Sequence, residues 1–163
     1  MSYAVYSTRG WILGSAPSGE ASKIYLLYTE DFGLVRARAQ SVRLLASKLR
    51  YNLEDYSFGT FSLVRGKEVW RLTGAEHSAI AQKPSPVRAR VLNLVKRLVQ
   101  GEERNDALFA TLREFEGKGE VREAVILSHI LGALGYLDLT TLETLSERQM
   151  IQAVNKALQE TQL

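Results

Sequence analysis

The sequence contains no cysteine among its 163 residues. This absence excludes disulfide bonds, zinc sites with thiolate ligands, iron–sulfur clusters and a cysteine nucleophile. Only two histidines are present, His77 and His129, and they do not form an H-x-x-x-H or comparable metal-ligand spacing. We therefore expect no metal site and no cofactor.

Long apolar runs are also missing, since no window approaches the roughly 18 apolar residues that a membrane span needs. The opening residues, MSYAVYSTRGW, lack a basic region followed by an apolar stretch. We expect no secretory signal, no membrane association and a cytoplasmic location. Neither G-x-G-x-x-G nor a P-loop motif occurs, and no serine has a partnered histidine nearby, so the sequence predicts a protein without enzymatic activity.

Positive charge is unevenly placed along the chain, although the net charge is only +3. Residues 1–83 carry 11 Lys and Arg against 7 Asp and Glu, whereas residues 84–163 carry 10 against 11. A basic first half indicates a polyanionic partner for that half. Ordinary scatter of charges is the alternative interpretation.

The first half of the sequence has the period-2 alternation and the aromatic and β-branched residues of strands. Turn residues separate the segments at Gly14–Gly19, at Glu30–Gly33 and at Arg65-Gly66. The expected strands are Tyr3–Leu13, Ile24–Tyr28, Leu34–Val42, Tyr56–Val64 and Glu68–Thr73. Five short strands predict a five-stranded OB-type β-barrel over residues 1–82. The stretch Leu44–Leu53 fits a helix better, and OB barrels commonly carry a helix between the third and fourth strands.

From Pro84 the period becomes helical, which predicts a C-terminal α-helical bundle over residues 83–163 and an α+β protein with the barrel packed on the bundle. Four helices are expected. Their predicted starts and stops are Ser85 to Gly101, Asn105 to Gly117, Gly119 to Leu134 with a stop at Gly135, and a last helix with a Ser146–Gln149 capping box. The third helix is apolar on most faces, which predicts a central position in the bundle.

The stretch RARAQSVRLLASKLR, residues 36–50, carries five cations and no acidic residue. On a strand, Arg36 and Arg38 point to the same face, and such a basic track on an OB barrel suits a nucleic-acid backbone. Four tyrosines lie near in the sequence and could stack on bases: Tyr25, Tyr28, Tyr51 and Tyr56. The alternative is that these tyrosines belong to the core and that the arginines only solubilise a strand face.

Several short motifs of the sequence, taken in order, resemble the RecO family of bacterial recombination mediators. The resemblance covers residues 10–139 and is carried by these motifs: Gly10-Trp11-Ile12-Leu13, Gly19-Glu20, Lys23-Ile24, Leu27-Tyr28-Thr29, Gly33, Ala37, Ala39, Arg43, Ser47-Lys48-Leu49, Leu53 to Tyr56, Arg65-Gly66, Leu72-Thr73, Ala75-Glu76 and the LGALGYLDL stretch of residues 131–139. The sequence departs from the family at Ser22, Gln40 and Ser41, where many members have Asp, Lys and Gly. It also lacks the four-cysteine zinc segment of many members and is shorter than typical members, so the expectation is a short form without zinc.

The resemblance implies an OB-type first domain and a role in DNA recombination and repair. Implied activities are binding of single- and double-stranded DNA, annealing of complementary strands and help in loading the RecA recombinase. Implied partners are RecR and the C-terminal tail of single-stranded DNA-binding protein. The predicted DNA-contact residues are Lys23, Arg36, Arg38, Arg43, Lys48 and Arg50, and the predicted partner-contact residues are Arg88, Arg90, Lys96 and Arg97.

Two other classes of function stay open at this point. One is an OB module that binds RNA or another single strand. The other is a protein–protein adaptor without catalytic activity whose barrel face is covered by the helices.

Overall fold

The computed structural model describes residues 3–43, 49–77, 85–116, 118 and 122–161. The chain forms two compact units, of which the first comprises residues 1–92 and 99–104 and the second comprises residues 93–98 and 105–163. The predicted domain boundary at residue 82 lies outside the described residues and stays a prediction.

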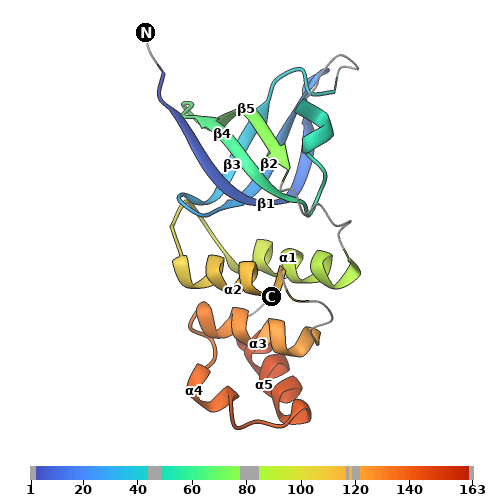
Figure 1. The fold of residues 1–163 in the computed structure, drawn as a ribbon, viewed down its shortest axis with the longest axis vertical. Helices are drawn as coiled ribbons and strands as arrows, with labels where there is room; N and C mark the ends of the chain where they lie inside the picture. Colours follow the sequence, from blue (N-terminus) through green and yellow to red (C-terminus); the bar gives the residue numbers. More distant parts are fainter. Residues whose placement is uncertain (1–2, 44–48, 78–84, 117, 119–121, 162–163) are drawn as a thin grey trace. The chain divides into compact units, whose positions relative to one another are not determined.

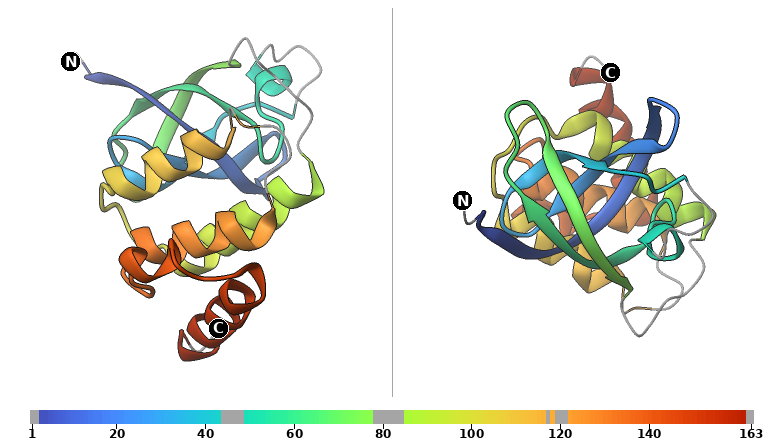
Figure 2. Two further views of the ribbon diagram at one scale, coloured as in Figure 1. Left: turned by 60° about the horizontal axis from the view of Figure 1, so that its bottom comes forward. Right: turned by 90° about the horizontal axis from the view of Figure 1, so that it is seen from above.

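Five strands close into a barrel in the first unit (Figure 1). They are β1 (Val5–Ser18), β2 (Ser22–Thr29), β3 (Gly33–Ala39), β4 (Phe58–Val64) and β5 (Trp70–His77), in the order β1-β2-β3-β5-β4. All neighbours are antiparallel except β3 and β5, which pair in parallel. Both views of Figure 2 show the strands wrapping around one another. The expected OB-type barrel followed by helices is confirmed.

Small or apolar residues alternate with polar residues along the strands, and the small or apolar ones face the barrel interior. In β3, Val35, Ala37 and Ala39 are fully buried, while the two arginines between them are exposed. The inward residues of the other strands, among them Leu27 and Trp70, join them in one buried cluster. Burial of this apolar surface is the main stabilising term of the barrel.

Strand β1 is longer than the sequence predicts, and the expected turn at Gly14–Gly19 is wrong. Ser15 to Ser18 pair with β2 after a register shift between Ile12 and Gly14, and the turn falls at residues 19–21. A β-bulge bends the strand at this shift, so it continues through residues whose composition is typical of a turn. Of the predicted helix at 44–53, residues 44–48 lie outside the described residues, and Leu49–Asn52 form the 3₁₀ helix η1.

The helices are α1 (Pro86–Leu98), which runs from the first unit into the second, and α2 (Asp106–Glu116), α3 (Glu123–Ala133), α4 (Leu139–Leu142) and α5 (Glu147–Glu160). The predicted caps are confirmed: Ser85 accepts from Arg88 N–H, Asn105 accepts from Leu108 N–H, and Ser146 forms the capping box with Gln149. Within the second unit, α3 contacts α2, α4 and α5, which confirms its central position. Short α4, capped by Asp138, was not predicted.

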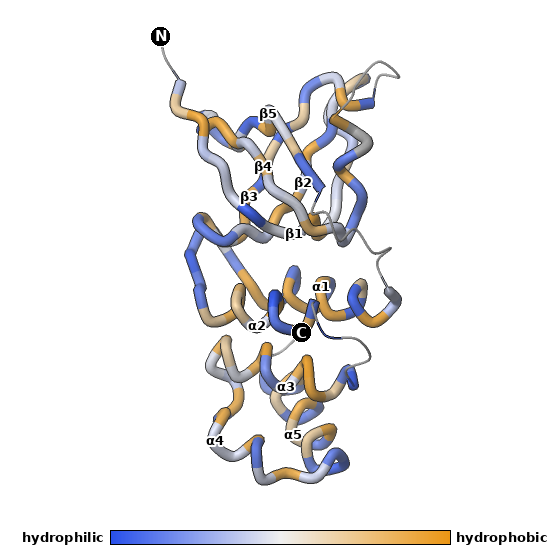
Figure 3. The backbone as a smooth tube through the Cα atoms, in the orientation of Figure 1, coloured by the Kyte–Doolittle hydropathy of each residue, from blue (hydrophilic) through white to orange (hydrophobic). Residues whose placement is uncertain are grey.

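Residues 99–104, here called the return segment, belong to the first unit and lie against the start of β3. The N–H of Leu34 donates to the Gly101 carbonyl at 3.2 Å, and Arg104 pairs with Asp31 at 3.2 Å. Most of the segment after Val99 is hydrophilic (Figure 3), and hydrogen bonds and charge help to hold it here. It covers the part of β3 that lies beyond the pairing with β5, a strand edge that would otherwise be open.

Gly33 permits this close approach of the return segment. Its φ is +65°, a region that glycine enters freely, and a Cβ at this position would lie 2.3 Å from the Glu103 carbonyl oxygen. A side chain at residue 33 would therefore meet both backbone strain and a backbone clash.

We expect Gly33→Ala to lower the free energy of unfolding by about 3 kcal/mol or more, because left-handed strain of about 1–2 kcal/mol adds to overpacking. Gly19→Ala is the matched control: its φ is +71°, but no atom lies within 4 Å of the added Cβ. The control should lose only about 1 kcal/mol. Denaturant unfolding of both variants measures the difference, and equal losses would show that the return segment does not press on residue 33.

Candidate nucleic-acid interface

Arg36 and Arg38 lie on the outer face of β3, where the strand pleat places them. Both side chains are exposed, whereas Val35, Ala37 and Ala39 point into the barrel. The alternation read from the sequence therefore gives the correct face for both arginines.

Arg71, on β5, is the neighbour of Arg38 across the barrel closure. The parallel pairing sets Ala37 opposite Trp70 and Arg38 opposite Arg71. Trp70 is buried and Arg71 is exposed, so Arg71 shares the outer face with Arg38. The side chains of Arg38 and Arg71 thus project from adjacent strands on the same face of the barrel.

A shallow hollow of about 400 Å³ lies beside these arginines, at the β4–β5 hairpin loop (residues 65–69). Its lining residues are Arg38, Gln40, Gly66, Lys67, Glu68, Val69 and Arg71, and we call this hollow the basic groove. The loop in this conformation requires a glycine at residue 66, because a Cβ there would lie 2.0 Å from the Val69 carbonyl oxygen. Three cations against one carboxylate give the groove a formal charge of +2.

The cations of the basic groove have no carboxylate partner within the described part of the chain: Arg38, Lys67 and Arg71 form no ion pair there. By contrast, Arg9 on β1 holds Glu30 through two hydrogen bonds of 2.9 Å, and these bonds raise the pKa of Arg9. A cation that is already neutralised attracts an anion weakly. The cations of the basic groove are not neutralised in this way and keep their full attraction for an anion.

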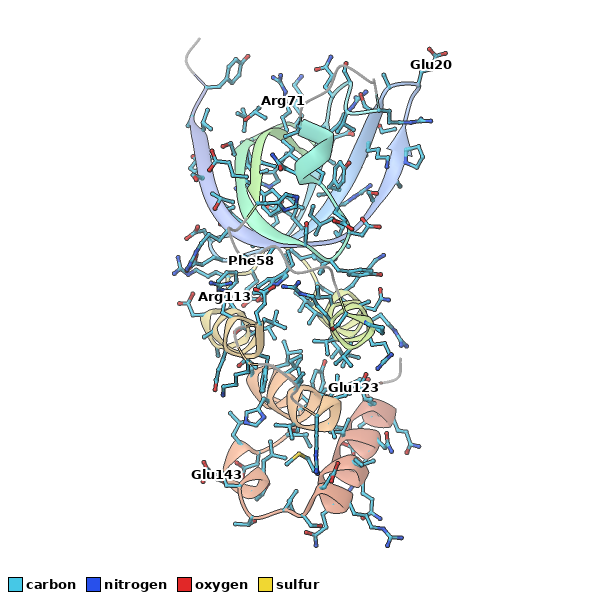
Figure 4. The ribbon with its side chains drawn as sticks, turned by 45° about the vertical axis from the view of Figure 1, so that its right-hand side comes forward. Glu20, Phe58, Arg71, Arg113, Glu123 and Glu143 are labelled. Carbon is cyan, nitrogen blue, oxygen red and sulfur yellow. The ribbon has the colours of Figure 1, made fainter. Side chains whose placement is uncertain are left out.

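The groove overlaps the usual ligand face of OB folds, where strands 2 and 3 and the loops β1–β2 and β4–β5 bind oligonucleotides, through β3 and the β4–β5 loop. In Figure 4, Arg71 and Glu20 of the β1–β2 turn lie at the same end of the barrel, and Phe58 lies at the other end. The sequence-predicted Arg38 and the unpredicted Lys67 and Arg71 therefore meet at this end, whereas Arg36 lies outside the lining of the groove.

Arg43 lies beyond the end of β3, where it is exposed and also makes hydrogen bonds to the β1–β2 turn. Its Nη1 donates to the Gly19 carbonyl oxygen at 3.2 Å, and its backbone N–H donates to the Ala21 carbonyl at 2.9 Å. Both bonds fix the β1–β2 turn, residues 19–21. Arg43 thus lies at the turn, with part of its hydrogen-bonding capacity already in use.

Lys23 is not brought onto the same face as Arg36 and Arg38. It pairs with Ala39, which is fully buried, and residues opposite one another on neighbouring strands point to the same side of the sheet. The half-buried side chain of Lys23 therefore leaves the strand on the face that points toward the barrel interior. Lys48 and the side chain of Arg50 lie outside the described residues, so their predicted roles stay predictions.

The tyrosines considered for base stacking divide into different environments. Tyr25 and Tyr28 are 3% and 0% exposed, so they belong to the core, as the second interpretation of the sequence held. Burial raises the pKa of Tyr25, and the charge of Asp55 adds to the shift. Tyr56 is half-buried, and the side chain of Tyr51 lies outside what the structure describes. In the first unit, exposed aromatic surface comes instead from Tyr3, just before β1, and from Tyr6 on β1.

The four predicted partner-contact residues all lie on α1. Arg88 and Arg90 belong to the first unit, and Lys96 and Arg97 belong to the second, in the last turn of the helix. Arg90, Lys96 and Arg97 are exposed, and Arg88 is half-buried. Their role in partner binding stays a prediction.

The described ranges hold neither a cluster of metal ligands nor a membrane-spanning helix. No group of three or more His, Asp or Glu residues there lies close enough to hold a metal ion. None of the helices found there combines the length and the apolar character that crossing a membrane requires. His129, half-buried on α3, contacts the Val125 carbonyl at 2.8 Å and packs edge-on against Phe115.

Comparison with known proteins identifies the barrel. Residues 1–81 match the family model described as "Recombination protein O N terminal". The chain is 39% identical over 71 residues to a DNA repair protein RecO of Dehalococcoides mccartyi, a match that covers 44% of this chain and 28% of the relative. It is 38% identical over 73 residues to the DNA repair protein RecO of Rubrobacter xylanophilus, covering 45% and 29%. With that of Alkaliphilus metalliredigens it shares 24% identity over 111 residues, covering 64% and 45%.

The chain therefore spans less than half the length of each of these relatives. The matched residues contain the whole barrel, from β1 to β5, with its basic groove. Residues 1–81, which hold the barrel, match the N-terminal domain of the RecO family.

Proposed function

We propose that the chain takes part in DNA repair and recombination by binding DNA along the basic groove of its barrel. The observation that carries this proposal is the pairing of Arg38 with Arg71 on the outer face, beside Lys67 and without carboxylate partners in the described part of the chain. The relatives in the comparison are named DNA repair proteins, which supports DNA as the polyanion. The role is binding, with no catalytic step.

Backbone phosphates are the chemical groups that the groove suits best. It is shallow and presents guanidinium and ammonium groups, so it neutralises phosphates without enclosing a base. Phosphate contacts carry no sequence information, and we expect binding to be insensitive to base sequence.

The first prediction for this function concerns the salt dependence of binding to a labelled oligothymidine. If Arg36, Arg38, Lys67 and Arg71 each contact one phosphate, log K falls with log salt at a slope of about −2.8, since each contact contributes about 0.7. Replacing Arg38 and Arg71 together by Gln should weaken binding and flatten the slope by about 1.4. Fluorescence anisotropy at several salt concentrations measures both quantities.

Arg148→Gln with Lys156→Gln is the matched control, because it removes the same charge from two exposed residues of α5. This control should keep the wild-type slope. A groove variant that melts like the wild type and keeps its affinity and slope would show that DNA does not bind in the groove. Competition between single-stranded DNA, duplex DNA and structured RNA at one salt concentration decides among the polyanions. Absence of salt-dependent binding to all three would favour the protein–protein adaptor.

We also propose that the chain anneals complementary DNA strands and assists RecA loading. A surface that neutralises phosphates and leaves base edges free allows two strands to approach and pair. We expect the Arg38, Arg71 double variant to lose annealing of complementary labelled oligonucleotides in proportion to its loss of affinity. Retained annealing by a variant that no longer binds would separate this activity from the groove.

RecR and the acidic C-terminal tail of single-stranded DNA-binding protein are the proposed protein partners, with Arg88, Arg90, Lys96 and Arg97 as contacts. Opposite charge supports the tail assignment, because this helix carries four basic residues and no acidic residue. Binding of a labelled tail peptide should weaken several-fold when Lys96 and Arg97 are replaced by Gln, and should be unaffected by the Arg148, Lys156 control. Calorimetry or anisotropy measures it, and unchanged binding would remove α1 from the assignment.

A further inference from the structure

The β4–β5 hairpin carries one more cation, Arg65, whose situation differs from that of the groove residues. Arg65 directly precedes Gly66 and Lys67, which line the basic groove. Its Nη1 donates to Glu102 Oε2 of the return segment at 2.9 Å. The hairpin therefore has one basic residue with a carboxylate partner next to another without one.

Two further contacts hold this ion pair in place. The other oxygen of Glu102 accepts a hydrogen bond of 2.9 Å from the indole Nε1 of Trp70. The guanidinium of Arg65 lies over the Trp70 ring, 4.0 Å from the ring centroid. Glu102 is thus fixed by a donor from the core, and Arg65 is fixed by an aromatic face and a carboxylate.

We propose that Arg65, next to the basic groove, is a further cation able to contact a phosphate and that Glu102 withholds it from that contact in the wild-type protein. A carboxylate and a phosphate offer the same oxygen acceptors to a guanidinium. Glu102 therefore occupies the position of a phosphate at Arg65. This inference rests on the proposed DNA binding and adds to it a residue and the group that restrains it.

The pair is exposed enough for a phosphate to compete. The Arg65 and Glu102 side chains are 60% and 41% exposed, and exposed ion pairs contribute little to stability. A guanidinium has five N–H donors, of which the contact with Glu102 uses Nη1. Trp70 keeps the ring plane beneath Arg65 when the partner changes, so a phosphate meets a guanidinium that is already oriented.

Glu102→Gln in the full chain tests this inference, because an amide oxygen still accepts from Trp70 Nε1 while the negative charge is gone. We expect the affinity for a labelled oligothymidine to rise about fivefold at 0.1 M salt, and the salt slope to steepen by about 0.7, the value of one added phosphate contact. Arg65→Gln alone should change the affinity less than about twofold, because Glu102 already neutralises Arg65. In the Glu102→Gln background, Arg65→Gln should cancel the gain.

Glu30→Gln is the matched control, since Glu30 also pairs with an arginine, Arg9, and its loss changes the net charge equally. The control should change affinity less than about twofold. If Glu102→Gln gains no more than Glu30→Gln, or if its gain persists without Arg65, the inference is overturned. A double-mutant cycle over Glu102 and Arg65 with no coupling energy would overturn it as well.

The outcomes separate this inference from the proposed function. A wild-type protein without salt-dependent DNA binding overturns both. An Arg38, Arg71 double variant that loses binding as expected, together with a Glu102→Gln variant that behaves like the control, overturns the role of Arg65 alone. Melting curves and tryptophan emission of each variant show whether Trp70 keeps its surroundings.

Discussion

Strands β3 and β5 pair in parallel over two residue positions, Ala37 with Trp70 and Arg38 with Arg71, and this contact closes the barrel. Its inward members, Ala37 and Trp70, are buried in the core. Its outward members, Arg38 and Arg71, line the basic groove. One short pairing therefore sets both the interior packing and the candidate binding surface. Beyond it, β3 depends on the return segment, whose Gly101 carbonyl accepts from Leu34.

The same pairing carries an electrostatic cost, because like charges directly opposite one another destabilise a sheet. Arg38 and Arg71 stand in this relation, and no ion pair relieves either of them in the described ranges. Solvent screening keeps the cost small in the free protein. An anion that bridges the two guanidinium groups would turn this repulsion into attraction, which is a physical reason for a groove of this kind to bind phosphate.

Local patterns of the sequence predicted much of the fold. The alternation of β3 gave the outward direction of Arg36 and Arg38, and the caps at Ser85, Asn105 and Ser146 gave three helix starts. What the sequence missed depends on contacts between distant segments. Arg71 is brought to Arg38 by the closure of the barrel, and Glu102 is brought to Arg65 by a return of the chain over 37 positions. Four-residue α4 is too short for a helical period to show, and the bulge after Ile12 carries β1 through turn-like residues.

Net charge also explains why the site was only half visible in the sequence. A surplus of three positive charges over 163 residues says little, because the cations of the barrel differ in their partners. Arg9 is held by Glu30 and Arg104 by Asp31, and both pairs lie outside the lining of the groove. Arg38 and Arg71 have no such partner among the described residues. Attraction for a polyanion depends on the charge that remains after internal pairing, and the fold leaves that charge along one side of the closure between β3 and β5.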